Sequence, residues 1–294
     1  MAVTKNQLQL GQMLSALREA RGLSQREVEA GTKRAINKSS LSNLENARGP
    51  VTSWPTCQIL AEFYGADEAT TARIVYLAQH ATDRGDWEDY SGFSEFALFV
   101  SLEADADELV IFDPEIVTGL LQTPEYARAV LAAGDELTED EIAKALAVRT
   151  RRTERVLRPG GPLVTWITTE GALRRVVGGA DTHRCQIDHL MFPPSDRVTI
   201  EVIREDSGAY AGLRGGYTLL RFGQGTYLND TAYIESIDGC RYIDDPDKLE
   251  LYNSNTRALR RVARPLAEVY EDVAQVVPKR NQRRAVRRSS QAHD

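Results

Sequence analysis

The sequence has few cysteines, three among 294 residues: Cys57, Cys185 and Cys240. No two are spaced as Cys-x-x-Cys and their number is odd, which argues against a disulfide framework and against a zinc ribbon. Cys185 and His189 are four residues apart, a spacing that can place two metal ligands on one helix face. Because no second pair of ligands accompanies them, we expect no metal and no cofactor.

Long apolar runs are also missing. The longest one near the middle of the chain, Phe96 to Val100, is far shorter than the roughly 20 residues that cross a bilayer. Residues 1–10 lack the basic-then-apolar pattern of a signal peptide. We therefore expect a cytoplasmic protein that does not associate with membranes.

The motifs of several large enzyme classes are absent. The sequence contains no Gly-x-Ser-x-Gly, no His-Glu-x-x-His and no phosphate-binding loop. Glu201, Glu205 and Asp206 could form paired carboxylates, but carboxylates beside a strand are more typical of a solvated edge. We expect that the protein is not an enzyme.

Charge is distributed unevenly along the chain. Residues 1–80 hold nine Lys and Arg against seven Asp and Glu, whereas residues 81–278 hold 21 against 35. An acidic body repels DNA, so contacts with nucleic acid must come from the ends of the chain. The tail, residues 278–294, has few apolar residues, and we expect it to be disordered. Its basic residues could add non-specific phosphate contacts: Lys279, Arg280, Arg283, Arg284, Arg287 and Arg288.

The sequence predicts four segments. Residues 1–81 form an all-α domain of five helices, residues 82–105 a connector, residues 106–277 an acidic α+β domain and residues 278–294 the tail. Leu10, Met13, Leu14 and Leu17 place one apolar face on the first helix. Capping residues and glycines then bound four more helices, which run from Ser24 to Gly31, from Asn37 onward, from Thr52 or Ser53 to Gly65, and from Asp67 to about Ala81.

In the α+β domain we expect a small, mostly antiparallel sheet. Clusters of Val, Ile, Thr, Tyr and Phe between Gly and Pro predict strands at 163–168, 198–204, 216–222 and 231–237. Helical patterns cover 124–133, 138–157, 183–192 and 247–275, and Pro265 should kink or divide the last of these helices.

The second and third helices form a helix-turn-helix. Leu41 and Leu44 would face inward, and the opposite face of the third helix carries polar side chains and one cation. Such side chains suit a helix in the major groove, where Asn pairs with adenine and Lys reaches guanine. The predicted base contacts are Lys38, Ser39, Ser42 and Asn43. The alternative is an ordinary solvated helix face.

Phosphate contacts are predicted around this helix. Gln25 and Arg26 lie at a helix start, where free N–H groups and the helix dipole favour an anion. The other predicted phosphate contacts are Lys33, Arg34, Asn37 and Arg48, which lie before, at the start of and after the recognition helix.

Residues 10–80 resemble the XRE-type, lambda-repressor-like helix-turn-helix domain. The resemblance rests on Leu17-Arg-Glu-Ala-Arg-Gly-Leu-Ser-Gln25 and on Ile36-Asn-Lys-Ser-Ser-Leu-Ser-Asn-Leu-Glu45. It implies that Gln25 lies against phosphate and the start of the recognition helix, and that Lys38, Ser39, Ser42 and Asn43 read bases. The turn, Gly31 to Ile36, is about two residues longer than is usual in that family.

The rest of the chain resembles the C-terminal domain of WhiJ-like regulators of actinobacteria. The motifs are Trp87-Glu-Asp-Tyr90, Leu102-Glu-Ala104, Gly119-Leu-Leu-Gln-Thr-Pro-Glu-Tyr-Ala-Arg128, Leu173-Arg-Arg175 with Gly178-Gly179, and Gly216-Tyr-Thr-Leu-Leu220. This chain has Thr118 where that class usually has proline. The resemblance implies a transcriptional regulator, and for some members control by a small partner protein in an antitoxin-like arrangement.

Two functions follow as expectations. The first is a DNA-binding regulator whose acidic domain forms a homodimer and senses an effector or a small partner protein. The second is an antitoxin-like module that neutralises a small partner protein and binds DNA only secondarily. A plain hydrophobic core is the first interpretation of several aromatic residues in the strand region, and an effector pocket lined by them is the alternative: Trp166, Tyr210, Tyr217, Phe222 and Tyr233.

Overall fold

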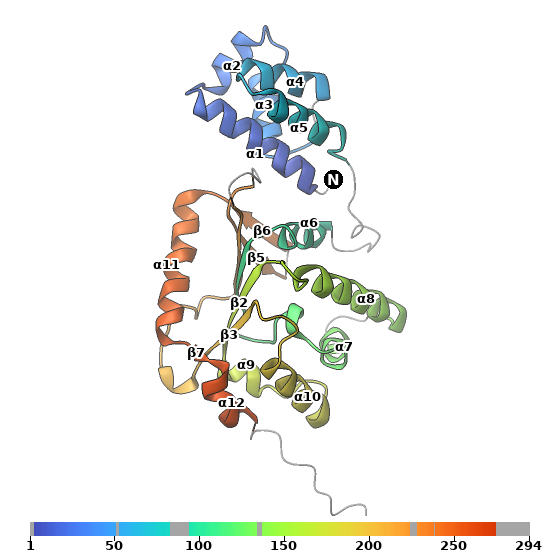
Figure 1. The fold of residues 1–294 in the computed structure, drawn as a ribbon, viewed down its shortest axis with the longest axis vertical. Coiled ribbons are helices and arrows are strands. Elements are labelled where there is room, and N and C mark those ends of the chain that lie inside the picture. Colours follow the sequence, from blue (N-terminus) through green and yellow to red (C-terminus); the bar gives the residue numbers. More distant parts are fainter. Residues whose placement is uncertain are drawn as a thin grey trace, which may run out of the picture.

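The first part of the chain is helical, as predicted. The computed structural model describes residues 3–50, 53–82, 94–133, 137–223, 228–237 and 239–274. The N-terminal helices are α1 (Lys5–Ala20), α2 (Gln25–Gly31), α3 (Lys38–Glu45), α4 (Trp54–Phe63) and α5 (Glu68–Gln79) (Figure 1). Ser24, Asn37 and Asp67 each accept a hydrogen bond from a backbone N–H of the first turn that follows, so these helices begin where their caps predict.

The N-terminal helices surround one hydrophobic cluster. Leu10 and Leu14 of α1 meet Leu41 of α3, Leu60 of α4 and Leu77 of α5, and all five side chains are fully buried. Because α3 contributes only one narrow apolar face to this cluster, its other side is left for solvent.

The C-terminal α+β region is built on a mixed sheet, which corrects the expectation of a small, mostly antiparallel one. Seven strands lie within the described residues, in the order β6-β5-β4-β1-β2-β3-β7. The central pairs β1–β2 and β2–β3 are parallel, and the other pairs are antiparallel. The strands are β1 (Glu108–Phe112), β2 (Leu163–Thr169), β3 (Val198–Ile203), β4 (Tyr217–Arg221), β5 (Thr231–Ser236), β6 (Gly239–Ile243) and β7 (Arg264–Pro265).

Helices cover both faces of this sheet. α11 (Pro246–Val262) lies alone on one face, and most of the other helices lie on the opposite face (Figure 1). Part of the predicted connector forms helix α6. Pro265 divides the last predicted helix, as expected, because it lies in the short strand β7 that pairs with β3. The remaining helical elements are α6 (Ser94–Glu103), η1 (Gly119–Leu121), α7 (Pro124–Ala133), α8 (Glu139–Val156), α9 (Glu170–Arg174), α10 (Ala180–Met191), η2 (Glu205–Ser207) and α12 (Leu266–Ala274).

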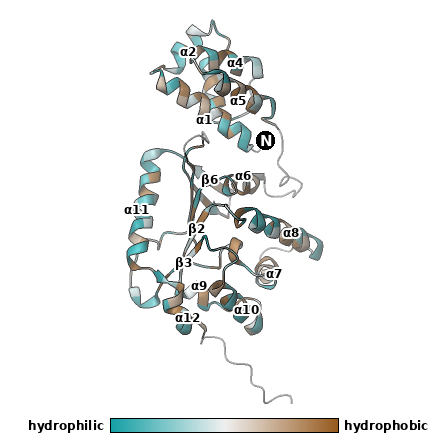
Figure 2. Cartoon of the chain, viewed as in Figure 1, coloured by the Kyte–Doolittle hydropathy of each residue, from teal (hydrophilic) through white to brown (hydrophobic). Residues whose placement is uncertain are grey.

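Alternate residues of the strands feed two separate cores. Leu109 and Ile111 of β1 belong to a cluster with Trp166, on the side of α6 to α10. Val110 and Phe112 point the other way and belong to a cluster with Leu259 of α11. Figure 2 shows the same division, with apolar strands between helices whose outer faces are hydrophilic. Within the described residues, no helix is both long and apolar enough to cross a membrane.

Helix α1 joins the helical region to the α+β region. The side-chain amide of Gln12 donates to Asp244 at 3.1 Å and accepts from the backbone N–H of Asn229 at 3.2 Å. Near the start of the same helix, Lys5 forms an ion pair with Asp105 at 2.6 Å. α1 therefore contacts the α+β region on behalf of the helical region, and the exposed polar residues of α3 lie outside this contact.

The buried imidazole of His183 on α10 makes stability depend on pH. Burial lowers the pKa of His183. In the unfolded chain the imidazole returns to a pKa of about 6.5, so below that pH the unfolded state binds the additional proton. The free energy of unfolding should therefore fall as the pH drops from about 7.5 to about 5.5, and less steeply in His183→Leu. Urea midpoints at the two pH values measure this, with His189→Leu at a partly exposed position of the same helix as control. If the free energy of unfolding changes equally with pH in His183→Leu and in the parent, His183 is not the source of the pH dependence.

Candidate DNA-binding interface

The helix-turn-helix begins with a capped α2. The backbone N–H of Ser24 donates to Glu27 at 2.7 Å, and the Ser24 hydroxyl accepts from the backbone N–H of Glu27 at 3.4 Å. Hydrogen bonds that the Glu27 carboxylate accepts from the side chain and backbone of Ser24 lower the pKa of Glu27. The reciprocal pair fixes the start of α2 and stabilises a negative charge close to the positive end of its dipole.

The backbone turns sharply after α2, although the turn has more residues than is usual in the family that it resembles. Lys33 and Arg34 adopt left-handed backbone conformations, with φ of 52° and 67°. Asn37 then starts α3 by accepting a hydrogen bond from the backbone N–H of Ser40 at 2.8 Å. The longer turn therefore still delivers a capped helix, and both cations of the turn are exposed.

The polar face of α3 is open to solvent. Leu41 and Leu44 are buried, whereas Lys38, Ser39 and Asn43 are exposed. Ser42 is partly buried, and its backbone carbonyl accepts a hydrogen bond from the Asn46 side chain at 2.7 Å. Three of the four predicted base contacts thus present their side chains away from the core, as groove recognition requires.

One carboxylate ties α3 to the two preceding helices. Glu45 accepts hydrogen bonds from Arg18 of α1 at 2.6 and 3.1 Å, and one from the side-chain amide of Gln25 of α2 at 2.7 Å. The hydrogen bonds to Glu45 are the largest cause that raises the pKa of Arg18. The carboxyl side chain is only 4% exposed, so its three bonds lie away from water and hold the relative positions of α1, α2 and α3.

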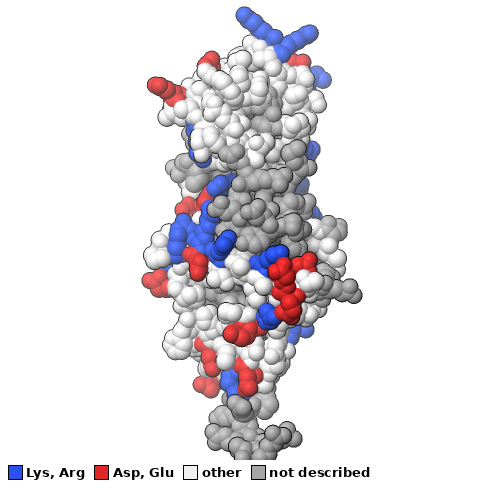
Figure 3. All heavy atoms as spheres, turned by 90° about the vertical axis from the view of Figure 1, so that its right-hand side faces the viewer, with Lys and Arg blue, Asp and Glu red and all other residues white. Residues whose placement is uncertain are grey.

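The predicted phosphate contacts divide into two kinds. Arg26, Lys33, Arg34 and Arg48 are exposed cations at the start of α2, in the turn and after α3. Gln25 and Asn37 use side-chain atoms for contacts with the protein itself: Gln25 donates to Glu45, and the exposed Asn37 caps α3. Figure 3 shows basic side chains projecting from the helical end of the molecule, and both basic and acidic side chains on the α+β region.

The aromatic residues predicted as an effector pocket are not brought together. Trp166, Tyr233 and Phe222 belong to the cluster beneath α6 to α10, whereas Tyr210 and Tyr217 belong to the cluster beneath α11. Tyr233 stacks on Phe99, and Tyr217 packs edge-on against Tyr252. Within the part of the chain that is described, no three His, Cys, Asp or Glu residues are arranged to hold a metal ion.

Comparison with known families assigns both regions. Residues 9–74 match a helix-turn-helix domain, which spans most of α1 through α5. Residues 96–275 match the family described as Domain of unknown function (DUF5753), and this match covers more than half of the chain. The chain belongs to the DUF5753 family. Neither a curated protein nor a solved structure matches it.

In this DUF5753 protein, the sequence reasoning missed the residues that position α3. Glu45 stood in the quoted helix-turn-helix stretch without a role, although its carboxylate joins three helices. Gly11 was also missed: a Cβ at this position would lie 2.6 Å from the carbonyl oxygen of Leu44 and 2.7 Å from that of Glu45. A glycine in the middle of an amphipathic helix was the available signal, since it usually marks a close approach.

Proposed function

We propose that this protein is a sequence-specific DNA-binding transcriptional regulator that acts in the cytoplasm and places α3 in the major groove. The observation that carries the proposal is the division of α3 between the buried Leu41 and Leu44 and an exposed polar face that the α+β region leaves open. The match of residues 9–74 to a helix-turn-helix domain and the resemblance to XRE-type and WhiJ-like regulators support it.

The exposed side chains take different roles in this proposal. Lys38, Ser39 and Asn43 read base edges, and Ser42 reaches the groove from the partly buried flank of α3. The phosphate contacts come from the four exposed cations, Arg26, Lys33, Arg34 and Arg48. Gln25 and Asn37 act mainly by holding α2 and α3 in place, while their remaining N–H groups face the backbone of the DNA.

Asn43→Ala is expected to weaken binding to the cognate site by about 1–3 kcal/mol and to change binding to scrambled DNA much less. The reason is that a bidentate amide–adenine contact exists only on the correct sequence. Arg48→Ala should instead weaken binding to both duplexes about equally. It should also reduce the slope of log K against log[salt] by ~0.9 for each phosphate contact that is lost. Titrations of both duplexes at fixed salt, and of one duplex across a salt series, measure the two effects.

Circular dichroism serves as the folding control for these variants, since both side chains are exposed. A folded Asn43→Ala protein that binds both duplexes like the parent would show that α3 is not the reading helix. A parent that shifts no promoter DNA, but that co-purifies in fixed ratio with a small partner protein, would favour the antitoxin-like alternative.

We further propose that the α+β region forms the dimer and senses an effector or small partner. One recognition helix reads about half a site, and two half-sites a helical turn apart supply the usual affinity of such proteins. Light scattering of the full chain at micromolar concentration is expected to give twice the monomer mass, and with operator DNA that mass plus the mass of one duplex. A strict monomer in both conditions rejects this assembly.

A further inference from the structure

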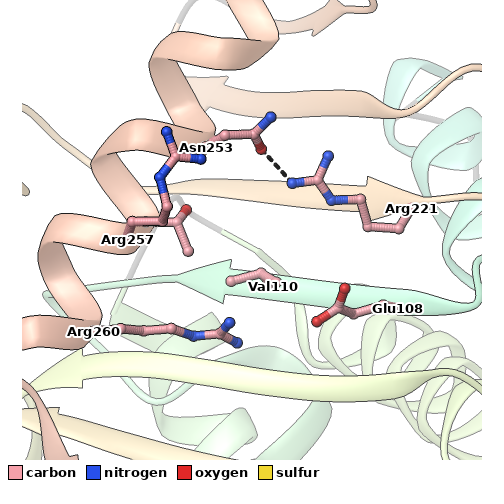
Figure 4. A pocket seen from close by; sticks show the side chains of 7 residues that line it. Glu108, Val110, Arg221, Asn253, Arg257 and Arg260 are labelled. Carbon is pink, nitrogen blue, oxygen red and sulfur yellow. Dashed lines mark hydrogen bonds between the residues drawn. The ribbon is translucent and has the colours of Figure 1, made fainter.

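A polar cavity lies between α11 and the sheet, away from the helix-turn-helix. Its volume is about 250 Å³. One wall is α11, whose inward polar residues recur at the spacing of one helix face, and the floor is the β1–β4 pair (Figure 4). The lining residues are Glu108, Val110, Arg221, Asn253, Thr256, Arg257 and Arg260.

Two of the three lining arginines form ion pairs with carboxylates that do not line the cavity. Arg221 forms an ion pair with Asp230 at 2.8 Å and donates to the side-chain oxygen of Asn253. Arg257 forms an ion pair with Glu250 at 2.6 Å. A guanidinium carries five N–H donors, so these contacts leave further donors of both groups for the cavity.

The third arginine is anchored in the same manner. Arg260 donates to the Thr165 hydroxyl at 3.1 Å, and its Nε lies 3.6 Å from a carboxyl oxygen of Glu201. Its side chain is 40% exposed, so the guanidinium sits at the mouth of the cavity rather than beneath it. Arg257 and Arg260 are three residues apart on α11 and therefore converge on one opening.

Glu108 is the unusual member of the floor. It stands directly opposite Arg221 in the β1–β4 register and is partly buried. Nevertheless, among the described residues no hydrogen bond to its carboxylate and no ion pair within 4.0 Å is present. The neighbouring arginines bond elsewhere, which leaves one acceptor and several donors facing the same cavity (Figure 4).

We propose that this cavity binds a small metabolite that carries an oxyanion at one end and a hydrogen-bond donor at the other. The oxyanion, a phosphate or a carboxylate, is held by Arg257 and Arg260 in the bidentate manner that guanidinium groups favour. The donor, an ammonium or hydroxyl group, is taken by Glu108. The volume lies just below the range of about 300–1,000 Å³ typical of drug-sized ligands, which suits a metabolite of few atoms. Binding does not depend on the proposed DNA recognition.

Isothermal titration calorimetry of the full chain tests the proposal with three probes. Phosphoethanolamine carries both a phosphate and an ammonium group, ethyl phosphate lacks the ammonium, and β-alanine replaces the phosphate by a carboxylate. We expect saturable one-to-one binding of phosphoethanolamine or of β-alanine. The tighter of the two identifies the oxyanion, and weaker binding of ethyl phosphate than of phosphoethanolamine reports the donor end.

Variants then assign the binding to these residues. Arg257→Gln and Arg260→Gln should each weaken the tighter probe about tenfold or more. Glu108→Gln should weaken phosphoethanolamine to the level of ethyl phosphate and leave ethyl phosphate unchanged. Arg261→Gln, an exposed arginine of the same helix that does not line the cavity, is the matched control and should bind like the parent. Circular dichroism checks the fold of each variant.

Two results would overturn the proposal. One is the absence of saturable heat with every probe at millimolar concentration. The other is binding that Arg257→Gln and Arg260→Gln, both folded, reduce no more than Arg261→Gln does.

Discussion

Replacing Glu103 by alanine is expected to lower the free energy of unfolding by about 3–5 kcal/mol, because it leaves a buried guanidinium without its carboxylate. Glu103 is 0% exposed and accepts two hydrogen bonds from Arg152, at 2.6 and 2.7 Å. The Arg152 guanidinium also lies over the rings of Phe96 and Phe99. Water therefore has little access to the charge once its partner is removed.

A second guanidinium increases this effect. Burial, with the charge of Arg152, lowers the pKa of Arg149 to about 10, and Arg149 donates to the side-chain oxygen of Gln122. Both guanidinium groups pack against Gly119, where a Cβ would lie 3.1 Å from Arg152. Without Glu103, Glu235 is left as the carboxylate that acts on both cations and offsets part of their repulsion.

Urea denaturation measures the loss, with Asp140→Ala as the control. That substitution removes an exposed i,i+4 pair with Lys144 and should cost no more than about 0.5 kcal/mol. The double variant Glu103→Leu with Arg152→Met should recover most of the loss, since apolar residues can replace a buried pair. If Glu103→Ala costs no more than Asp140→Ala, the buried pair does not hold α6 on α8.

Gly11→Val is expected to destabilise the helical region by about 3 kcal/mol, the upper end for overpacking, and to abolish specific DNA binding. Helix propensity alone predicts the opposite sign, because glycine inside a helix is less favourable than valine. The close approach decides between the two effects: the added atoms would meet the carbonyl oxygens of Leu44 and Glu45, which are backbone and cannot rotate away. α3 must then shift relative to α1.

Ala16→Val is the matched control, since it adds the same side chain at an exposed position of α1. It should cost only a few tenths of a kcal/mol. Thermal unfolding and operator titration together check the prediction. A Gly11→Val protein as stable as Ala16→Val, with unchanged operator affinity, would mean that α1 and α3 have room between them.

Local signals in the sequence located most of the elements. Ser24, Asn37 and Asp67 predicted helix starts because a cap is a property of a few adjacent residues. The strand predicted at 163–168 is β2, and the one predicted at 198–204 is β3, each within a residue or two. These strands were found because β-branched and aromatic residues cluster between turn residues.

The central strand was missed, and with it the character of the sheet. β1, Glu108–Phe112, has a continuous apolar run without alternation after its first residue, which is typical of a strand buried on both faces. Its pairing with β2 requires the long crossover through α7 and α8, and pairing across such a distance cannot be read from a local pattern. For the same reason the exposed face of α3 was predictable from periodicity, whereas the tie from Glu45 to Arg18 and Gln25 was not.

The contact of α1 with the α+β region has a consequence for the DNA that the proposed regulator would select. Gln12, which bonds Asp244 and Asn229, is the immediate neighbour of Gly11, which touches the end of α3. The orientation of α3 relative to the α+β region is therefore set by its contact with a single helix, α1. In the proposed dimer, the C-terminal regions would then set the distance between the two copies of α3, whereas the proposed base contacts, Lys38, Ser39, Ser42 and Asn43, would set the base preference. Substitutions at Asp244 would alter the number of base pairs tolerated between half-sites and leave the preferred half-site sequence unchanged. Half-site spacing and half-site sequence could then evolve independently.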